Sequence, residues 1–186
     1  MAPILDPAFC EWGSSQFLII STNVFADYIY YSHVLPAVAA LVLGFFVWLR
    51  SPRSKLNITF FAVAVFFGVW SFFDLILWAT EKTPYTMFFW SVQIYFDLLI
   101  YAGMLYFFYL FVDQKDVSLT KKILMALPFV PLLFFAHTEY NLIGFDYSNC
   151  DREALEGPLW QYVYLVEVGY VIWMALVGME RIRRVR

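Results

Sequence analysis

Cysteine, basic residues and catalytic motifs are all scarce in this 186-residue chain, and each scarcity excludes a class of protein. Two cysteines are too few for a disulfide framework. A formal net charge of −3 argues against nucleic-acid binding, which needs a basic face to neutralise phosphates. The chain has no phosphate-cradling glycine loop, nucleophile elbow, His-Glu-x-x-His zinc motif or paired-cysteine motif. We therefore expect no enzyme activity, no cofactor and no nucleic-acid partner.

Apolar residues, by contrast, make up 62% of the chain and charged residues only 15%. A soluble globular domain is roughly 45–50% apolar, so this composition predicts an integral membrane protein. Aromatic residues account for 22% of the chain, and many fall near the ends of apolar runs, where their rings favour the headgroup layer. The acidic first residues lack the basic start of a cleavable signal peptide, so none is expected.

Five apolar runs are expected to cross the membrane as helices. In the first run, Ala40 and Gly44 are four residues apart, a spacing of small residues that lets another helix backbone come close. The expected fold class is an all-α polytopic bundle, with an outer N-terminal segment at residues 1–27 and an outer loop at 137–158. The five runs are residues 28–49, 58–79, 87–112, 123–136 and 159–178.

The fourth run is short and contains Pro128 and Pro131, so its length alone fits a re-entrant segment equally well. The distribution of basic residues along the chain favours a kinked span over a re-entrant segment. If all five runs cross, ten of the twelve basic residues lie on one side, which the positive-inside rule places in the cytoplasm, with the amino terminus outside and the carboxyl terminus inside. The ten are Arg50, Arg53, Lys55, Lys115, Lys121, Lys122, Arg181, Arg183, Arg184 and Arg186.

Acids inside three of these runs are the candidate site residues: Asp74, Asp97 and Glu167. A carboxylate within a membrane span is costly and is usually turned toward a protein interior or a watery cavity. No Lys or Arg lies within any predicted span, so the expected partners are water, hydroxyl groups and amides. Four residues of the third run recur at spacings of three and four and so share one helix face: Trp90, Gln93, Asp97 and Tyr101.

Two interpretations of these acids stay open. The first is an acidic pocket, open to the outside, that binds a cation or a proton and includes Asp74, Asp97, Glu167, Gln93 and Tyr101. The second is that each acid is a protonated or hydrogen-bonded tie between helices, and this interpretation is preferred for Glu167.

Cys10 and Cys150 both fall on the predicted outer side, where either a disulfide or two unpaired thiols fits the sequence. His33 and His137 also fall there, but no spacing supports a metal site, so interfacial packing is expected for both and no metal ion is predicted.

Several features together resemble the amino-terminal seven-span membrane region of many bacterial histidine kinases. They are the basic linker after the first run, the tryptophans of the second, the Phe89-Trp90-x-x-Gln93 opening of the third, the Lys121-Lys122 pair and the prolines of the fourth. Two features differ from that family: five spans are predicted here where the family has seven, and this sequence carries no transmitter domain. The resemblance implies a sensor input module in the bacterial cytoplasmic membrane.

The leading functional prediction is accordingly a non-enzymatic sensory or signal-relay module that passes an outside or intramembrane stimulus to a cytoplasmic partner. The expected partners are the lipid bilayer, a cytoplasmic signalling kinase and a second copy of the chain. The alternative is a small proton- or cation-coupled transporter or channel subunit that uses the intramembrane carboxylates.

Overall fold

The computed structural model describes residues 26–80, 83–146 and 153–185, and these residues are mostly helical. Four helices are long and apolar enough to cross a membrane, which confirms the first, second, third and fifth predicted runs as candidate spans. They are α1 (Ala26–Arg50), α2 (Lys55–Ala79), α3 (Thr83–Asp113) and α6 (Pro158–Val185).

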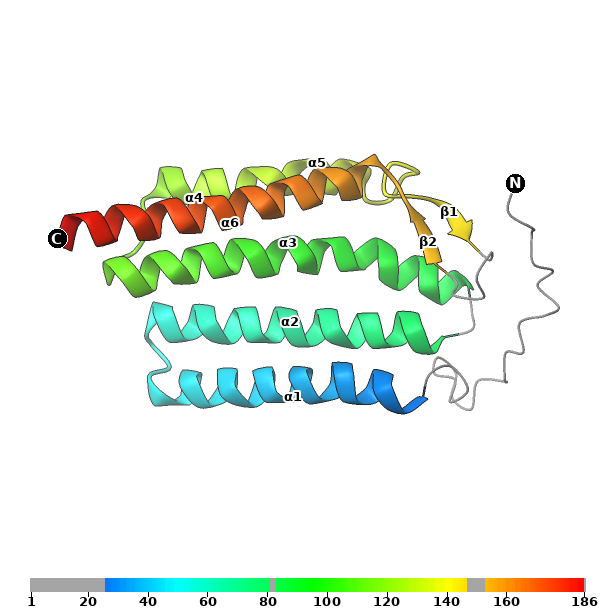
Figure 1. Ribbon diagram of the computed structural model, residues 1–186, viewed down its shortest axis with the longest axis horizontal. Coiled ribbons are helices and arrows are strands. Elements are labelled where there is room, and N and C mark those ends of the chain that lie inside the picture. The colour runs from blue at the N-terminus through cyan, green and yellow to red at the C-terminus, as the bar shows by residue number, and fades with distance from the viewer. Residues whose placement is uncertain (1–25, 81–82, 147–152, 186) are drawn as a thin grey trace.

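These long helices lie side by side in a row, in the order α1, α2, α3 and α6 (Figure 1). The predicted close approach at Gly44 is present: a Cβ atom there would lie 2.6 Å from the Cβ of Ala64 on α2. Aromatic rings join α2 to α3, with the Phe73 ring centroid 5.0 Å from that of Phe89 and 5.3 Å from that of Phe96. Close van der Waals packing of this kind drives helix association in a membrane, where the hydrophobic effect does not.

The fourth predicted run is helical but broken. It comprises α4 (Leu119–Ala126), a 3₁₀ turn at Leu127–Phe129 and α5 (Val130–Phe135), and it lies along α6 (Figure 1). Pro128 lies in the turn, where its missing N–H interrupts the helical hydrogen bonds. Tyrosine hydroxyls from α3 and α6 donate to backbone carbonyls around this break, as expected for a proline kink whose neighbours satisfy it. The three bonds run from Tyr95 to Leu132, from Tyr162 to Pro128 and from Tyr170 to Met125, at 3.0, 3.1 and 2.6 Å.

The hydrophobic core lies where α3, the α4–α5 segment and α6 meet. Leu98 and Leu105 of α3, Leu132 of α5 and Val163 of α6 are completely buried there. Helix α1 contacts mainly α2 and leaves many large apolar side chains exposed, as suits a helix that faces lipid.

A short β-hairpin corrects the all-α prediction. Strand β1 (Leu142–Asp146) pairs antiparallel with β2 (Glu153–Glu156) within the predicted outer loop. Asn141, completely buried, holds the hairpin on the bundle because its amide donates to the carbonyls of Ser91 and Ala136, at 3.1 and 2.6 Å. The strands were not predicted from the sequence because neither alternates apolar and polar residues over the four to eight positions that identify a strand.

The hairpin lies at the end of the bundle where α1 and α3 begin and α2 ends (Figure 1). Gly157 makes the turn from β2 into α6, and a Cβ atom at this residue would lie 2.2 Å from the carbonyl oxygen of Tyr140. Helix α6 extends to Val185, beyond the predicted end at 178, and carries the arginine-rich tail as helix. The described basic residues that were predicted to share one side all lie toward the opposite end from the hairpin.

Candidate functional site

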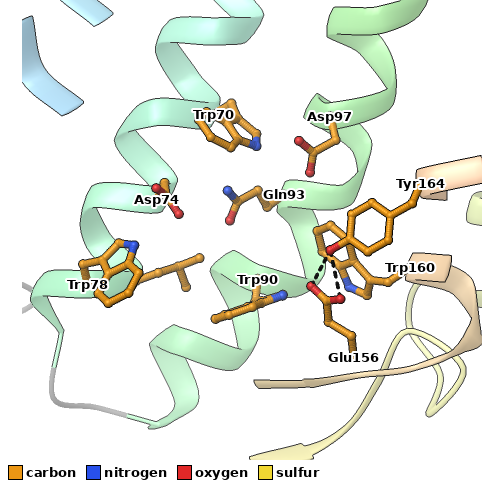
Figure 2. Close-up of a pocket in the computed structure, with 10 residues that line it drawn as sticks. Trp70, Asp74, Trp78, Trp90, Gln93, Asp97, Glu156, Trp160 and Tyr164 are labelled. Atoms are coloured by element: carbon orange, nitrogen blue, oxygen red, sulfur yellow. Dashed lines mark hydrogen bonds between the residues drawn. The ribbon is translucent and has the colours of Figure 1, made fainter. Parts of the chain in front are cut away.

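A cavity of about 230 Å³ lies near the hairpin end of the bundle, between α2, α3, β2 and the start of α6 (Figure 2). Its lining combines three carboxylates, one amide and five aromatic rings. Among the residues that the structure describes, the lining contains no Lys, Arg or His. The lining residues are Trp70, Asp74, Leu77, Trp78, Trp90, Gln93, Asp97, Glu156, Trp160 and Tyr164.

Helical periodicity places most of this lining. On α2 the lining residues follow Trp70 by four, seven and eight positions, and on α3 they follow Trp90 by three and seven, so each set shares one helix face. The predicted polar face of the third run is therefore correct for Trp90, Gln93 and Asp97. The cavity also brings Asp74 of α2 and Asp97 of α3 to the same space, as the pocket interpretation expected.

Asp74 has a partner that the sequence reasoning missed. His33 Nε2 on α1 lies 2.6 Å from Asp74 Oδ2, and the hydroxyl of Ser71 donates to the His33 carbonyl at 3.0 Å. The expectation of water, hydroxyl and amide partners was wrong for Asp74, because it considered Lys and Arg as the cationic partners and not histidine. The position of His33 near the outer end of the first run was the available signal. This contact ties α1 to the site.

Asp97 lies deeper than Asp74, about 21 Å along α3 from its first residue. Figure 2 shows the indole nitrogen of Trp70 directed at the Asp97 carboxylate. Three other carboxylates, those of Asp74, Glu156 and Glu167, are close enough to act on Asp97 electrostatically. Several negative charges so close together favour a cation or protons in the space between them.

Glu156, Trp160 and Tyr164 form the wall that sequence analysis did not find. The Tyr164 hydroxyl donates to both carboxylate oxygens of Glu156, at 2.8 and 2.9 Å. Glu156 ends β2 and reaches the cavity only because the hairpin packs on α3. The acidic character of the outer loop was the one signal that could have drawn attention to it.

Two polar groups of the cavity lack partners among the described residues, while the Trp70 indole nitrogen faces Asp97. The indole nitrogen of Trp160 is buried without a hydrogen bond, and Trp160 is only 4% exposed. The side chain of Gln93 is 5% exposed, makes no hydrogen bond within the described chain and points into the cavity beside Asp74 (Figure 2). Buried polar groups are normally hydrogen-bonded, so unpartnered groups around a cavity indicate that something polar occupies it.

The remaining predicted site residues lie elsewhere. Tyr101 and Glu167 do not line the cavity; each lies one helical turn beyond it, after Asp97 and Tyr164 respectively. His137 lies with Glu139 at a separate cleft. Within the described chain, no three His, Cys, Asp or Glu residues are grouped so as to hold a metal ion. Cys10 and Cys150, the predicted disulfide candidates, lie outside the described residues.

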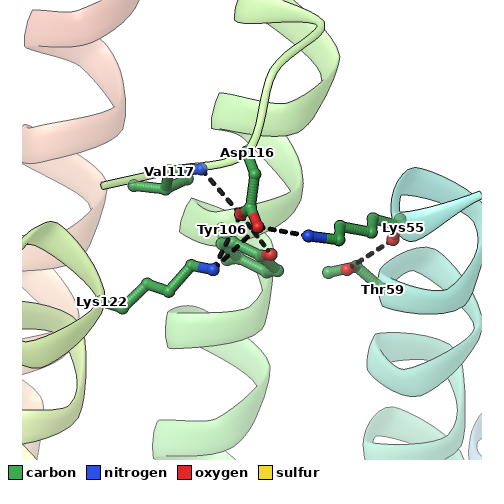
Figure 3. Close-up of polar contacts among 6 residues, drawn as sticks. All are labelled: Lys55, Thr59, Tyr106, Asp116, Val117 and Lys122. Atoms are coloured by element: carbon green, nitrogen blue, oxygen red, sulfur yellow. Dashed lines mark hydrogen bonds and ion pairs between the residues drawn. The ribbon is translucent and has the colours of Figure 1, made fainter. Parts of the chain in front are cut away.

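A charged cluster lies at the opposite end of the bundle, around Asp116 in the linker between α3 and α4 (Figure 3). Its carboxylate is 2.5 Å from Lys55 Nζ at the start of α2 and 2.9 Å from Lys122 Nζ on α4, and it accepts a 2.8 Å hydrogen bond from the Tyr106 hydroxyl. The hydrogen bonds from the two lysines, and then that from Tyr106, hold the pKa of Asp116 well below its usual range. Nearby, Arg181 of α6 pairs with Asp113 of α3 at 2.8 Å. These contacts join all the helices except α1 and α5 at this end.

Comparison of the chain with protein-family models, with curated proteins and with solved structures finds no match. The class of the protein therefore rests on its own structure. Four apolar helices of spanning length make it an α-helical membrane protein, and its most distinctive feature is a cavity of carboxylates and tryptophans near one end.

Proposed function

We propose that this protein is a membrane-embedded recognition module that binds a small cation in the cavity and relays its presence to a partner on the other side of the membrane. One observation carries the proposal: Asp74, Asp97 and Glu156, from three different elements, face one cavity whose described lining has no basic side chain. Carboxylates are rare within membrane helices and commonly mark sites of ion or ligand binding.

The proposed topology has five spans, with the α4–α5 segment as the kinked fourth. The positive-inside rule then puts the arginine- and lysine-rich end in the cytoplasm and the hairpin and cavity at the outer face. The resemblance to membrane input regions of histidine kinases adds the bacterial cytoplasmic membrane as the location and a cytoplasmic signalling kinase as the partner.

The relay would run through the helices themselves. The cavity is built on α2, α3 and α6, and the same three helices reach the charged cluster at the opposite end. There the pairs Lys55–Asp116 and Arg181–Asp113 connect these helices to each other, and Lys122–Asp116 connects them to α4. A ligand that draws the three carboxylates together would shift the helices relative to one another. Packed helices respond to such changes by small rigid translations, which the charged end would present to a partner.

Cation-dependent tryptophan fluorescence tests this proposal, because four tryptophans line the cavity. The purified protein in lipid nanodiscs would be titrated with sodium, potassium, ammonium and alkylammonium salts. We expect a saturable change in emission with at least one cation, lost in Asp97→Asn. The matched control is Glu180→Gln, an exposed acid of α6 paired with Arg184 and outside the cavity. No response to any cation, or the same response in Asp97→Asn, would refute the proposal.

A second candidate function, cation or proton transport, is favoured by the position of Glu167. It lies one turn deeper than Tyr164 and acts electrostatically on both Asp97 and Tyr101, so acidic and hydroxyl groups continue from the cavity toward the middle of the bundle. Intramembrane carboxylates in series are typical of proton relays. Transport predicts cation or proton flux in proteoliposomes that Glu167→Gln abolishes; the recognition module predicts no flux and a copurifying cytoplasmic protein.

A further inference from the structure

We infer that the cavity is built for a quaternary ammonium ion, a cation whose charge is surrounded by methyl or methylene groups. The inference rests on the proposed function, since it names the class of cation that the same site would bind. Its basis is the aromatic lining, which a site for a simple inorganic cation does not need.

Aromatic rings enclose the acids on several sides. Trp70 and Trp78 come from α2, Trp90 from α3, and Trp160 with Tyr164 from α6 (Figure 2). The face of an indole ring attracts a cation through its quadrupole, and tryptophan does so more strongly than tyrosine or phenylalanine. Aromatic cages of this kind are a recurring means of recognising quaternary ammonium groups in proteins.

A small metal cation fits this site poorly. Metal ions such as Ca²⁺ need six or more oxygen ligands at about 2.3–2.6 Å, and Mg²⁺ needs a tight octahedron. The three carboxylates share the cavity, yet in the described chain no three acidic or histidine side chains converge closely enough to hold a metal. A ligand that interacts with all three carboxylates must therefore be larger than a single metal ion.

A quaternary ammonium is compatible with the hydrogen bonds that the acids already make. His33 Nε2 lies 2.6 Å from Asp74 Oδ2, and the Tyr164 hydroxyl donates to both oxygens of Glu156. Each carboxylate oxygen has two lone pairs, so the aromatic lining, rather than these bonds, favours a quaternary over a primary ammonium. A quaternary ammonium has no donor, so it needs only the charge of the acids and contact with the rings.

The cavity has a suitable size. Its volume is about 230 Å³. A cavity of about 150 Å³ is large enough to bind benzene, so this one has room for a small quaternary ammonium such as choline. The unpartnered amide of Gln93 offers both a donor and an acceptor to a hydroxyl or carbonyl carried by the same ligand.

Isothermal titration calorimetry with choline tests the inference directly. The intact protein in nanodiscs would be titrated with choline chloride and with 3,3-dimethylbutan-1-ol, which has the same shape with carbon in place of the charged nitrogen. We expect saturable binding of choline and none of the neutral analogue at the same concentrations. Binding of the neutral analogue with equal affinity would overturn the inference, because it would show a merely apolar cavity.

Tryptophan variants test the role of the rings. Trp90→Phe is expected to weaken choline binding by less than the roughly two- to thirty-fold value of a whole cation–π contact, because the phenylalanine ring keeps a weaker one. Trp48→Phe is the control, since Trp48 stacks on Phe61 outside the cavity, and it should change nothing. Trp78→Leu is a second variant, and it should not disturb the fold because Trp78 is 42% exposed. Unchanged choline affinity in both Trp90→Phe and Trp78→Leu would overturn the inference.

Failure of the inference and failure of the proposed function give different results. If sodium, potassium or a primary ammonium produces an Asp97-dependent fluorescence response but choline does not bind, the quaternary ammonium is wrong and the cation site stands. If no cation gives a response and choline does not bind, both are wrong.

Discussion

The contact between His33 and Asp74 should stabilise the attachment of α1, and removing it should be measurable. The two side chains are 16% and 23% exposed, and their atoms are 2.6 Å apart. A hydrogen bond to a charged group contributes about 1.5–3 kcal/mol in soluble proteins. Measured pairs within membrane proteins average about 0.6 and reach about 1.7 kcal/mol, because the unfolded helices also find partners in the membrane. For a short, largely buried pair we expect a coupling energy of about 1–2 kcal/mol.

The assay is a double-mutant cycle. His33→Ala, Asp74→Ala and the double variant would be unfolded in bicelles with increasing sodium dodecyl sulfate. The coupling energy is the sum of the losses in unfolding free energy of the two single variants minus the loss in the double variant. His137→Ala is the control for removing a histidine, because His137 lies at a different cleft. A coupling energy below about 0.3 kcal/mol, within the error of additivity, would refute the claim that this pair holds α1 to α2.

Three further predictions concern the rest of the bundle. The pKa of Asp116 is lowered, so its contribution to stability is complete above the usual carboxyl range and is lost progressively as pH falls from that range to the folded pKa. The difference in unfolding midpoint between wild type and Asp116→Asn should therefore be smaller at pH 3 than at pH 7. Gly44→Val should destabilise the α1–α2 contact by about 1–3 kcal/mol through overpacking, with partial rescue by Ala64→Gly, as detergent unfolding would measure. Asn141→Ala should cost about 2 kcal/mol and speed amide hydrogen exchange in β1 and β2, because two carbonyls lose their donor. No difference in exchange would contradict the last.

Much of the fold could be predicted because bilayer length and helical period leave few choices. Four of the five predicted spans are helices long and apolar enough to cross a membrane, and the three- and four-residue spacing of Trp90, Gln93 and Asp97 placed these residues on the face that the cavity uses. Periodicity gives a face but not the depth at which a cavity ends. For this reason Tyr101, on the same predicted face as Asp97, lies beyond the cavity.

The rest of the site depends on contacts between distant parts of the chain. Glu156 lies 59 positions after Asp97 and enters the cavity only through the hairpin, whose strands have no strong sequence signal. His33 meets Asp74 because α1 and α2 pack closely. The spacing of Ala40 and Gly44 predicted a close approach of another helix, but it did not identify α2 as that helix or fix the register that pairs His33 with Asp74. Helix faces follow from local sequence, whereas a site shared by several elements follows from how they pack.

Cysteine accessibility in right-side-out membrane vesicles tests whether the acidic cavity opens to the outside and prefers cations. Leu77, which lines the cavity, would be replaced by cysteine after Cys10 and Cys150 are changed to serine. We expect a trimethylammonium thiosulfonate to label Leu77→Cys from outside faster than an anionic sulfonate reagent does, and Asp97→Asn to reduce the difference. Ser118→Cys, at the opposite end, should not be labelled from outside. Equal rates for the two reagents, or labelling of Leu77→Cys only in inverted vesicles, would show that the cavity is not an outward-facing cation site.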